Sequence, residues 1–300
     1  MSQPGCTVTL CTYNRLESLK RSLASLLALD YSEYEIVIIN DASTDGTAKY
    51  LETLKDSKIK IVTHPKNLGL SEARNSGIKS AKYDFVASID DDCVADKFWL
   101  KNLMAGFTSE DISFVFGQVF YISENYHGYF PERLVKNIGA MWPMGGNIVY
   151  RKKVFEKIGY LNSDFFYFNN EDSEIAIRAV ANGFKYARTP QAIIIHEAAV
   201  WNIKSLLRSA RNGAVWPKLK KLYPKHYLEF NPKVWRGLVV LPWDYLYILT
   251  MPICILVLLM RYLMHGKRDF KIFFAKWPVL LLLRRYYIWK EAIKNQVLMF

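Results

Sequence analysis

The hydrophobic pattern of the first hundred residues alternates between two kinds of segment. Short runs rich in Val and Ile predict strands, and stretches with an apolar residue every three or four positions predict helices. The predicted strands are residues 7–11, 35–39, 58–62 and 83–89, and the predicted helices are residues 16–29, 44–54 and 71–81. This alternating order predicts an α/β fold, a mostly parallel sheet covered by helices on both faces.

After about residue 110 the pattern is less regular. The further predicted strands are residues 112–121, 147–150 and 192–196, and the further helices are residues 152–158 and 172–181. In open α/β sheets the ligand binds beyond the carboxyl ends of the strands. Polar clusters follow each of the first four predicted strands, so we expect the functional site at that edge of the sheet.

The last third of the chain is basic and apolar. Residues 201–300 contain 18 Lys and Arg and four Asp and Glu, whereas the first 200 residues are slightly acidic. Because this third is also rich in Leu, Ile, Trp and Tyr, an anionic membrane surface fits it better as a partner than nucleic acid does. Residues 201–222 predict a basic amphipathic helix that Pro217 can break.

Two apolar stretches follow. Residues 238–260 are long enough to cross a bilayer and carry one charge, Asp244, but they also contain two prolines. Residues 272–283 are too short to cross and predict an interfacial helix, with Arg284 and Arg285 facing lipid phosphates. A membrane span, an in-plane anchor and a buried helical hairpin of a soluble protein remain open.

Two features bear on the compartment. The four cysteines have no metal-type spacing, so they predict free thiols in a reducing environment. The first residues lack the basic start and the apolar run of a signal peptide. We therefore expect the N-terminal part of the chain to be cytoplasmic.

Three adjacent carboxylates, Asp90, Asp91 and Asp92, end the fourth predicted strand. Their mutual repulsion is relieved by a hard cation such as Mg²⁺ or Mn²⁺, which takes oxygen ligands and is commonly shared with substrate phosphates. Asp90 and Asp92, one residue apart, can converge on a single ion. Taken alone, the triplet is equally consistent with an acidic turn in solvent.

The other strand ends carry polar groups suited to a nucleotide. Asp41 can accept hydrogen bonds from a base or ribose, Tyr13 can cradle a base, and Arg74 can face a diphosphate. Simpler interpretations stay open, because Asp45 can be a helix cap and Arg15 a surface residue.

Together these segments resemble the inverting family 2 glycosyltransferases of GT-A fold, over roughly residues 6–200. The motifs that carry the resemblance are residues 9–15, residues 39–47, residues 67–69 with 73–77, residues 90–92, and residues 170–174 with Arg178 and Gly183. Residues 145–147 match the family's acceptor-side segment. One departure is Glu174, which stands where the family often has Asp.

The resemblance implies transfer of a sugar from a nucleotide-diphosphate-sugar, with Mg²⁺ or Mn²⁺ as cofactor. It implies Asp172 as catalytic base with Glu171 beside it, and a metal on Asp90, Asp92 and His196. It implies nucleotide-sugar contacts from Thr12, Tyr13, Arg15, Asp41, Arg74 and Asp91, and an acceptor or sugar pocket at Trp142, Gly146 and Asn147. His196 can instead be an ordinary strand-end histidine, and Trp142 a core residue.

We therefore expect three regions: a catalytic domain over residues 1–200, a basic amphipathic region over 201–235, and membrane-associated helices over 236–300. The expected acceptor is lipid-linked or a cell-surface glycan. A sugar-nucleotide pyrophosphorylase would need a glycine-rich loop after the first strand, where this chain has Thr12 to Arg15. A non-catalytic scaffold on the same fold is the other alternative, whereas a Rossmann dehydrogenase is excluded because no G-x-G-x-x-G follows a strand.

Overall fold

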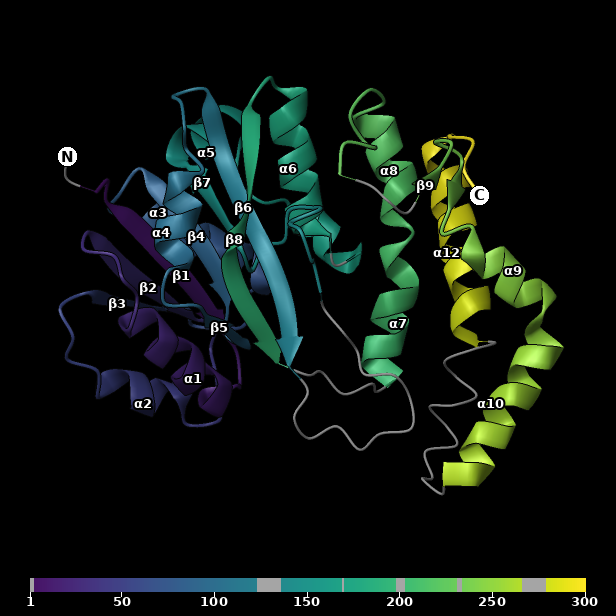
Figure 1. Ribbon diagram of the computed structural model, residues 1–300, viewed down its shortest axis with the longest axis horizontal. Coiled ribbons are helices and arrows are strands. Elements are labelled where there is room, and N and C mark those ends of the chain that lie inside the picture. Colours follow the sequence, from purple (N-terminus) through teal and green to yellow (C-terminus); the bar gives the residue numbers. More distant parts are fainter. Residues whose placement is uncertain (1–2, 123–135, 169, 198–202, 231–233, 266–278) are drawn as a thin grey trace. The chain divides into compact units, whose positions relative to one another are not determined.

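The computed structural model describes residues 3–122, 136–168, 170–197, 203–230, 234–265 and 279–300. Its contacts divide the chain into two compact units (Figure 1). The first comprises residues 1–122, 135–163 and 171–197, and the second comprises residues 123–134, 164–170 and 198–300.

The first unit is built on an eight-stranded sheet of order β3-β2-β1-β4-β7-β6-β8-β5 (Figure 1). The first four strands in that order correspond to the four strands predicted in the first hundred residues, and they run parallel as expected. These are β3 (Ile59–Thr63), β2 (Tyr34–Asn40), β1 (Cys6–Thr12) and β4 (Phe85–Asp90). The parallel half of the predicted α/β fold is therefore confirmed.

The other half of the sheet mixes strand directions. Its strands are β7 (Ile148–Arg151), β6 (Ile112–Ile122), β8 (Lys185–Glu197) and β5 (Cys93–Ala95). Strand β7 runs antiparallel to both β4 and β6, β8 is parallel to β6, and β5 is antiparallel to β8. Strand β5 was not predicted, and β8 is longer than residues 192–196 because its polar first half also pairs with β6.

Helices connect and cover these strands. They are α1 (Leu16–Leu27), α2 (Thr47–Glu52), α3 (Leu70–Ser80), α4 (Trp99–Ala105), α5 (Lys152–Ile158) and α6 (Glu171–Ala181). The short 3₁₀ helix η1 (Ser163–Phe168) belongs to the second unit except for its first residue. Helix α2 begins three residues later than predicted. Asp45 explains the delay, because its carboxylate accepts the backbone N–H groups of Leu16 and Thr47 and so closes the turns that precede α1 and α2.

Alternate residues of β2 bury on opposite faces of the sheet, which explains why both faces are covered. Ile36 and Ile38 pack in the cluster that contains Leu19 and Leu23 of α1. Val37 and Ile39 pack with residues on the other side, including Ala73 of α3. The carboxyl ends of β1, β2 and β4 then lie next to one another, since Thr12 pairs with Asn40 and Cys11 with Asp90.

The second unit contains five α-helices among its described residues and a two-stranded ribbon. The helices are α7 (Ile203–Asn212), α8 (Val215–Leu222), α9 (Trp243–Leu249), α10 (Met251–His265) and α12 (Leu280–Asn295), and the ribbon joins β9 (Val234–Trp235) to β10 (Val239–Val240). The helix predicted over residues 201–222 is broken between α7 and α8. Pro217 is not the break, because it lies in the first turn of α8, where proline is tolerated.

Residues 238–260 do not form one continuous helix, because they include β10, α9 and most of α10. Among the helices built from described residues, none combines the length and apolar character that crossing a bilayer requires. Asp244 is nearly buried and bonds both Arg284 and Arg285 of α12. Arg285 is itself buried, so the prediction that this arginine faces lipid phosphates was wrong.

Candidate active site

The three carboxylates at the end of β4 have different environments. Asp90 lies beside the buried Arg74, with Oδ1 2.6 Å from its guanidinium. Asp91 is buried, and its Oδ1 lies 3.0 Å from Arg15. Asp92 is partly exposed, and its Oδ2 lies 2.6 Å from the same Arg15 guanidinium. Arg74 therefore pairs with Asp90, and Arg15 pairs with both Asp91 and Asp92.

These environments separate the acidities of two of the carboxyl groups. Burial raises the pKa of Asp91 to about 6, although the Arg15 charge opposes the shift. Burial also acts to raise the pKa of Asp90, but the charge and hydrogen bond of Arg74 outweigh it and the net pKa is lowered. Asp90 is therefore a firmly ionised partner of Arg74.

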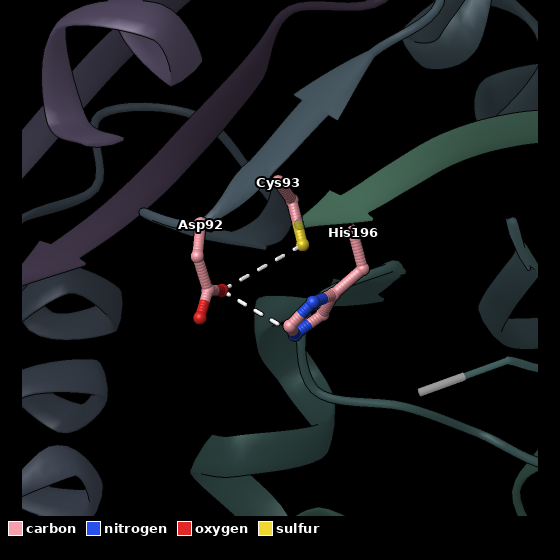
Figure 2. Close-up of side chains that lie close together, drawn as sticks. All are labelled: Asp92, Cys93 and His196. Atoms are coloured by element: carbon pink, nitrogen blue, oxygen red, sulfur yellow. Dashed lines mark hydrogen bonds and ion pairs between the residues drawn. The ribbon is translucent and has the colours of Figure 1, made fainter. Parts of the chain in front are cut away.

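His196, at the end of β8, points toward Asp92 and Cys93 (Figure 2). Its Nε2 lies 3.4 Å from Asp92 Oδ1, and its Nδ1 lies 2.7 Å from the carbonyl oxygen of Glu197. A ring nitrogen this close to a carbonyl carries a proton, so Nε2 is the ring nitrogen that faces the Asp92 carboxylate. In the tautomer with the proton on Nδ1, Nε2 and the carboxylate oxygen are two acceptors that can share a cation.

A divalent metal fits this arrangement. Carboxylate oxygen and imidazole nitrogen are ligands that Mn²⁺ accepts, and the Nδ1–H bond to Glu197 orients the ring as second-sphere partners of metal-bound histidines do. Of the three predicted ligands, the structure brings Asp92 and His196 together. Within the described residues the third member of the cluster is Cys93 and not Asp90, whose Oδ1 is bonded to Arg74.

Asp172 lies in the first turn of α6, where a negative charge is favoured by the helix dipole. Its Oδ2 accepts the backbone N–H of Gly145 at 2.9 Å, and its Oδ1 accepts the N–H of Ser173 at 2.7 Å. The side chain is only partly buried. The carboxylate is thus oriented by two fixed donors and still accessible.

Glu171, the preceding residue, is buried, with Oε1 2.9 Å from Arg74. Burial raises its pKa to about 7, against the opposing charge of Arg74. The two adjacent carboxyl groups therefore have different environments: Glu171 is buried and paired with Arg74, whereas Asp172 is accessible.

Arg74 joins the two sides of the site, since one guanidinium bonds both Asp90 and Glu171. Two glycines make this close approach feasible. A Cβ on Gly145 would lie 2.4 Å from Arg74 Nη1, and a Cβ on Gly146 would lie 2.6 Å from Asp90 Oδ2. Arg74 was predicted to face a diphosphate. It is only 6% exposed, so its observed role is to tie the triplet to the start of α6.

Asp41 is buried, and its carboxylate organises the loop that precedes α3. It accepts the backbone N–H groups of Leu68 and Gly69, each at 2.8 Å, and it lies 2.7 Å from Nδ1 of His64. The other ring nitrogen of His64 lies 2.9 Å from Ser76 Oγ. His64 was not singled out from the sequence, where a single histidine after a strand carries no distinctive spacing.

The remaining predicted contacts fall into two groups. Tyr13 and Arg15 are exposed at the carboxyl edge of the sheet and can meet a ligand, whereas Thr12 is buried beneath them. Gly146 is buried against Asp90, and Trp142 is partly exposed.

Asn147 corrects a prediction. It is fully buried, and its amide accepts from Trp99 Nε1 and donates to the carbonyls of Gln118 and Ala192. Its amide is used entirely within the fold, so we assign it a structural role in place of the predicted pocket contact.

The mixed sheet therefore carries the acidic triplet at its carboxyl edge, and the accessible Asp172 begins a helix that Arg74 ties to the same triplet. Residues 7–176 match the model of the family described as Glycosyl transferase family 2. Because the match covers more than half of the chain, the protein belongs to this family.

Related sequences include polysaccharide synthases. The chain is 40% identical over 94 residues to the poly-beta-1,6-N-acetyl-D-glucosamine synthase of Staphylococcus aureus, strain COL, and 42% identical over 93 residues to that of Staphylococcus epidermidis. Each match covers 31% of this chain and 23% of the relative. The chain therefore corresponds to less than a quarter of these relatives' length.

Solved structures share the fold over nearly the whole chain. The mannosyltransferase PcManGT from Pyrobaculum calidifontis, in complex with GDP-Man and Mn²⁺, superimposes with a TM-score of 0.61 at 17% identity, covering 99% of this chain and 88% of that one. TarS 1–349 of Staphylococcus aureus gives 0.55 at 16% identity, covering 97% and 88%. The mixed α/β architecture is consistent with the expected GT-A fold.

Proposed function

We propose that the protein transfers a sugar, with inversion, from a nucleotide-diphosphate-sugar to an acceptor hydroxyl, and that Asp172 is the base. The observation that carries the proposal is the position of Asp172: an accessible carboxylate held by the N–H groups of Gly145 and Ser173, on an element that Arg74 ties to the acidic triplet. Nucleotide-sugar use is supported by the family and by the GDP-Man complex of the structural relative.

Inverting transfer is a single displacement. The acceptor oxygen loses its proton to the Asp172 carboxylate and forms a bond to the anomeric carbon, while the bond to the diphosphate breaks and its electron pair leaves with the diphosphate. A positioned base accelerates such a step by about 10²–10⁴. Glu171 is unsuited to this role because it is buried and paired with Arg74.

Asp92 and His196 would hold Mg²⁺ or Mn²⁺ on the donor side. When bound, the ion supplies positive charge to the departing diphosphate. Arg15, whose side chain is half exposed beside Asp91 and Asp92, offers a second positive charge at the same edge. Tyr13 is exposed next to it and would stack on the base of the nucleotide.

The stereochemical test uses detergent-purified protein and a panel of nucleotide sugars with Mn²⁺ or Mg²⁺. Proton NMR of the first product formed gives the anomeric configuration through its coupling constant. We expect inversion relative to the donor. Retention would exclude a single displacement with Asp172 as base, even if transfer itself were confirmed.

We also propose that the C-terminal unit holds the enzyme at an anionic membrane surface, on the reducing side where its free thiols are stable. Exposed apolar side chains occur along both α9 and α10. They include Trp243, Leu246, Leu249, Ile253, Leu256, Met260 and Leu263. A second group recurs every three or four residues from the N-cap of α12 onward and so lies on one stripe of that helix. It comprises Val279, Leu282, Tyr286, Trp289 and Ile293.

An in-plane anchor is favoured by the exposed Trp and Tyr side chains of α9 and α12, since these residue types are enriched at the depth of the lipid headgroups. The exposure of the apolar side chains in both groups also speaks against a buried hairpin. A second copy of the chain is a poor occupant, because residues 201–300 carry 18 basic and four acidic side chains and would repel their like. A membrane-held enzyme suits a lipid-linked acceptor or a growing cell-surface glycan.

Vesicle sedimentation tests this anchoring. Wild-type protein is expected to bind vesicles with 30% anionic lipid (about one lipid in three) more tightly than neutral vesicles. Replacing Ile253 and Leu256 by Glu should weaken binding at least about tenfold, since each buried side chain contributes roughly 1.5–3 kcal/mol. Leu27→Glu, at an exposed position of α1, is the matched control. Failure of the wild type to bind, or self-association in its place, would overturn the anchoring proposal.

A further inference from the structure

Cys93 lies at the metal cluster in a position that the resemblance does not account for. It opens β5 and pairs directly with His196 of β8 in an antiparallel ladder, so both side chains project from the same face of the sheet (Figure 2). The backbone N–H of Glu197 bonds the carbonyl of Asp92 at 2.9 Å and holds the third residue beside this pair.

The ligand atoms of the three residues are spaced as a small metal site requires. Asp92 Oδ1 lies 3.4 Å from His196 Nε2 and 4.0 Å from Cys93 Sγ, and all three ligand atoms lie within 4.8 Å of one another. In a tetrahedral zinc site with bonds of about 2.0–2.3 Å, neighbouring ligand atoms are about 3.3–3.7 Å apart. Closing the cluster around an ion therefore takes side-chain shifts of about 1 Å or less.

Burial alone does not distinguish Cys93, since it packs at the edge of the hydrophobic core and is 1% exposed. The comparison with Cys6 is informative. Cys6 is equally buried in the same core, but its Sγ lies near a backbone carbonyl oxygen, that of Thr7. Cys93 differs by having a carboxylate and an imidazole within coordination distance.

We propose that Cys93 is a third protein ligand at this site and raises its affinity for a thiophilic divalent cation, Zn²⁺ or Co²⁺, while Mn²⁺ and Mg²⁺ are held by Asp92 and His196 alone. Sulfur is a soft ligand that favours zinc, whereas carboxylate and water suit magnesium and manganese. On binding, the thiol proton passes to buffer and a metal–sulfur bond forms. One coordination position stays open, which the donor diphosphate would fill; this last point rests on the proposed transferase function.

The test is metal binding by the full chain, made metal-free with a chelator and titrated with Co²⁺. Thiolate-bound Co²⁺ gives an intense charge-transfer absorption in the near ultraviolet, whereas oxygen and nitrogen ligands do not. We expect this band in the wild type and in Cys6→Ser, and its loss in Cys93→Ser and Cys93→Ala. Zn²⁺ affinity should fall at least about tenfold in the two Cys93 variants, whereas Mn²⁺ affinity should change less than about threefold.

Thermal unfolding of the metal-free variants shows whether each is folded, and two substitutions at Cys93 guard against one misfolding. An unchanged Co²⁺ spectrum in a folded Cys93 variant would overturn the proposal. Co²⁺ binding without the band in the wild type would also overturn it, while leaving a metal on Asp92 and His196 intact. No binding of Co²⁺, Zn²⁺ or Mn²⁺ by the wild type would overturn it together with the metal part of the proposed function.

Discussion

Arg74 forms ion pairs with carboxylates on two elements of the site. The substitution Arg74→Met removes its charge while keeping much of its length. The guanidinium lies 2.6 Å from Asp90 and 2.9 Å from Glu171, and the arginine side chain is 7% exposed. Removing one partner of a buried ion pair costs about 3–5 kcal/mol, because the remaining charge stays buried without compensation. Arg74→Met leaves one such carboxylate, Glu171, and also removes the partner of Asp90, whose side chain is 31% exposed.

The loss of stability should depend on pH with a defined sign. Burial raises the pKa of Glu171 to about 7, above its usual value, so its contribution is present at low pH and is lost as pH rises through 7. Without Arg74 its pKa rises further. At pH 5.5 the folded variant therefore carries a neutral Glu171 that needs no cation. The destabilisation should be at least about 1 kcal/mol smaller at pH 5.5 than at pH 8.

Urea unfolding of the wild type and the variant at both pH values measures these differences. Lys101→Met is the matched control, because Lys101 pairs with Asp30 and both side chains are about half exposed, 51% and 46%. Exposed pairs contribute about 0–1 kcal/mol, so the control should change little at either pH. A loss below 1 kcal/mol (roughly the exposed-pair value) in Arg74→Met, or one equal at both pH values, would refute the reasoning.

Three further substitutions test other parts of the site. Gly146→Ala places a Cβ 2.6 Å from Asp90 Oδ2 and should destabilise by about 1–3 kcal/mol and lower kcat, by unfolding and steady-state kinetics. Asn147→Ala should lower the free energy of unfolding by a similar amount, because it leaves the Trp99 indole N–H and two buried carbonyls without their hydrogen-bond partner. A change in donor KM alone would contradict the structural role of Asn147. His64→Ala, which frees Asp41, should raise donor KM more than it lowers kcat.

The part of the fold that the sequence predicts well is the part with local signals. Strands β1, β2 and β4 are rich in buried apolar residues, of which β2 has an unbroken run over residues 36–39, and polar residues mark the carboxyl ends of all three. The acidic triplet and Asp172 could be placed for the same reason, since each lies where a predicted strand or helix ends or begins. The resemblance also put Asp92 and His196 in one site, and they lie 3.4 Å apart; their roles stay predictions.

The features that were missed depend on contacts between distant segments. Strand β5 has three residues and is defined by its pairing with β8, about a hundred residues later in the chain. Such a short strand has no hydrophobic pattern of its own from which it could be predicted. Arg74 looked like a phosphate ligand because its sequence neighbours do not show that Glu171 lies 2.9 Å away. Asn147 was misassigned because a polar residue in a motif resembles a ligand until its three internal hydrogen bonds are seen.

The central claim is that Asp172 performs the chemistry and Asp92 holds the donor's metal. It is tested most directly by measuring donor binding and turnover separately in Asp172→Asn and Asp92→Ala, by calorimetry and by product formation with Mn²⁺ or Mg²⁺. The account predicts that Asp172→Asn binds donor like the wild type but loses about 10²-fold or more in transfer rate, whereas Asp92→Ala loses metal-dependent donor binding. Wild-type turnover in Asp172→Asn would contradict the account.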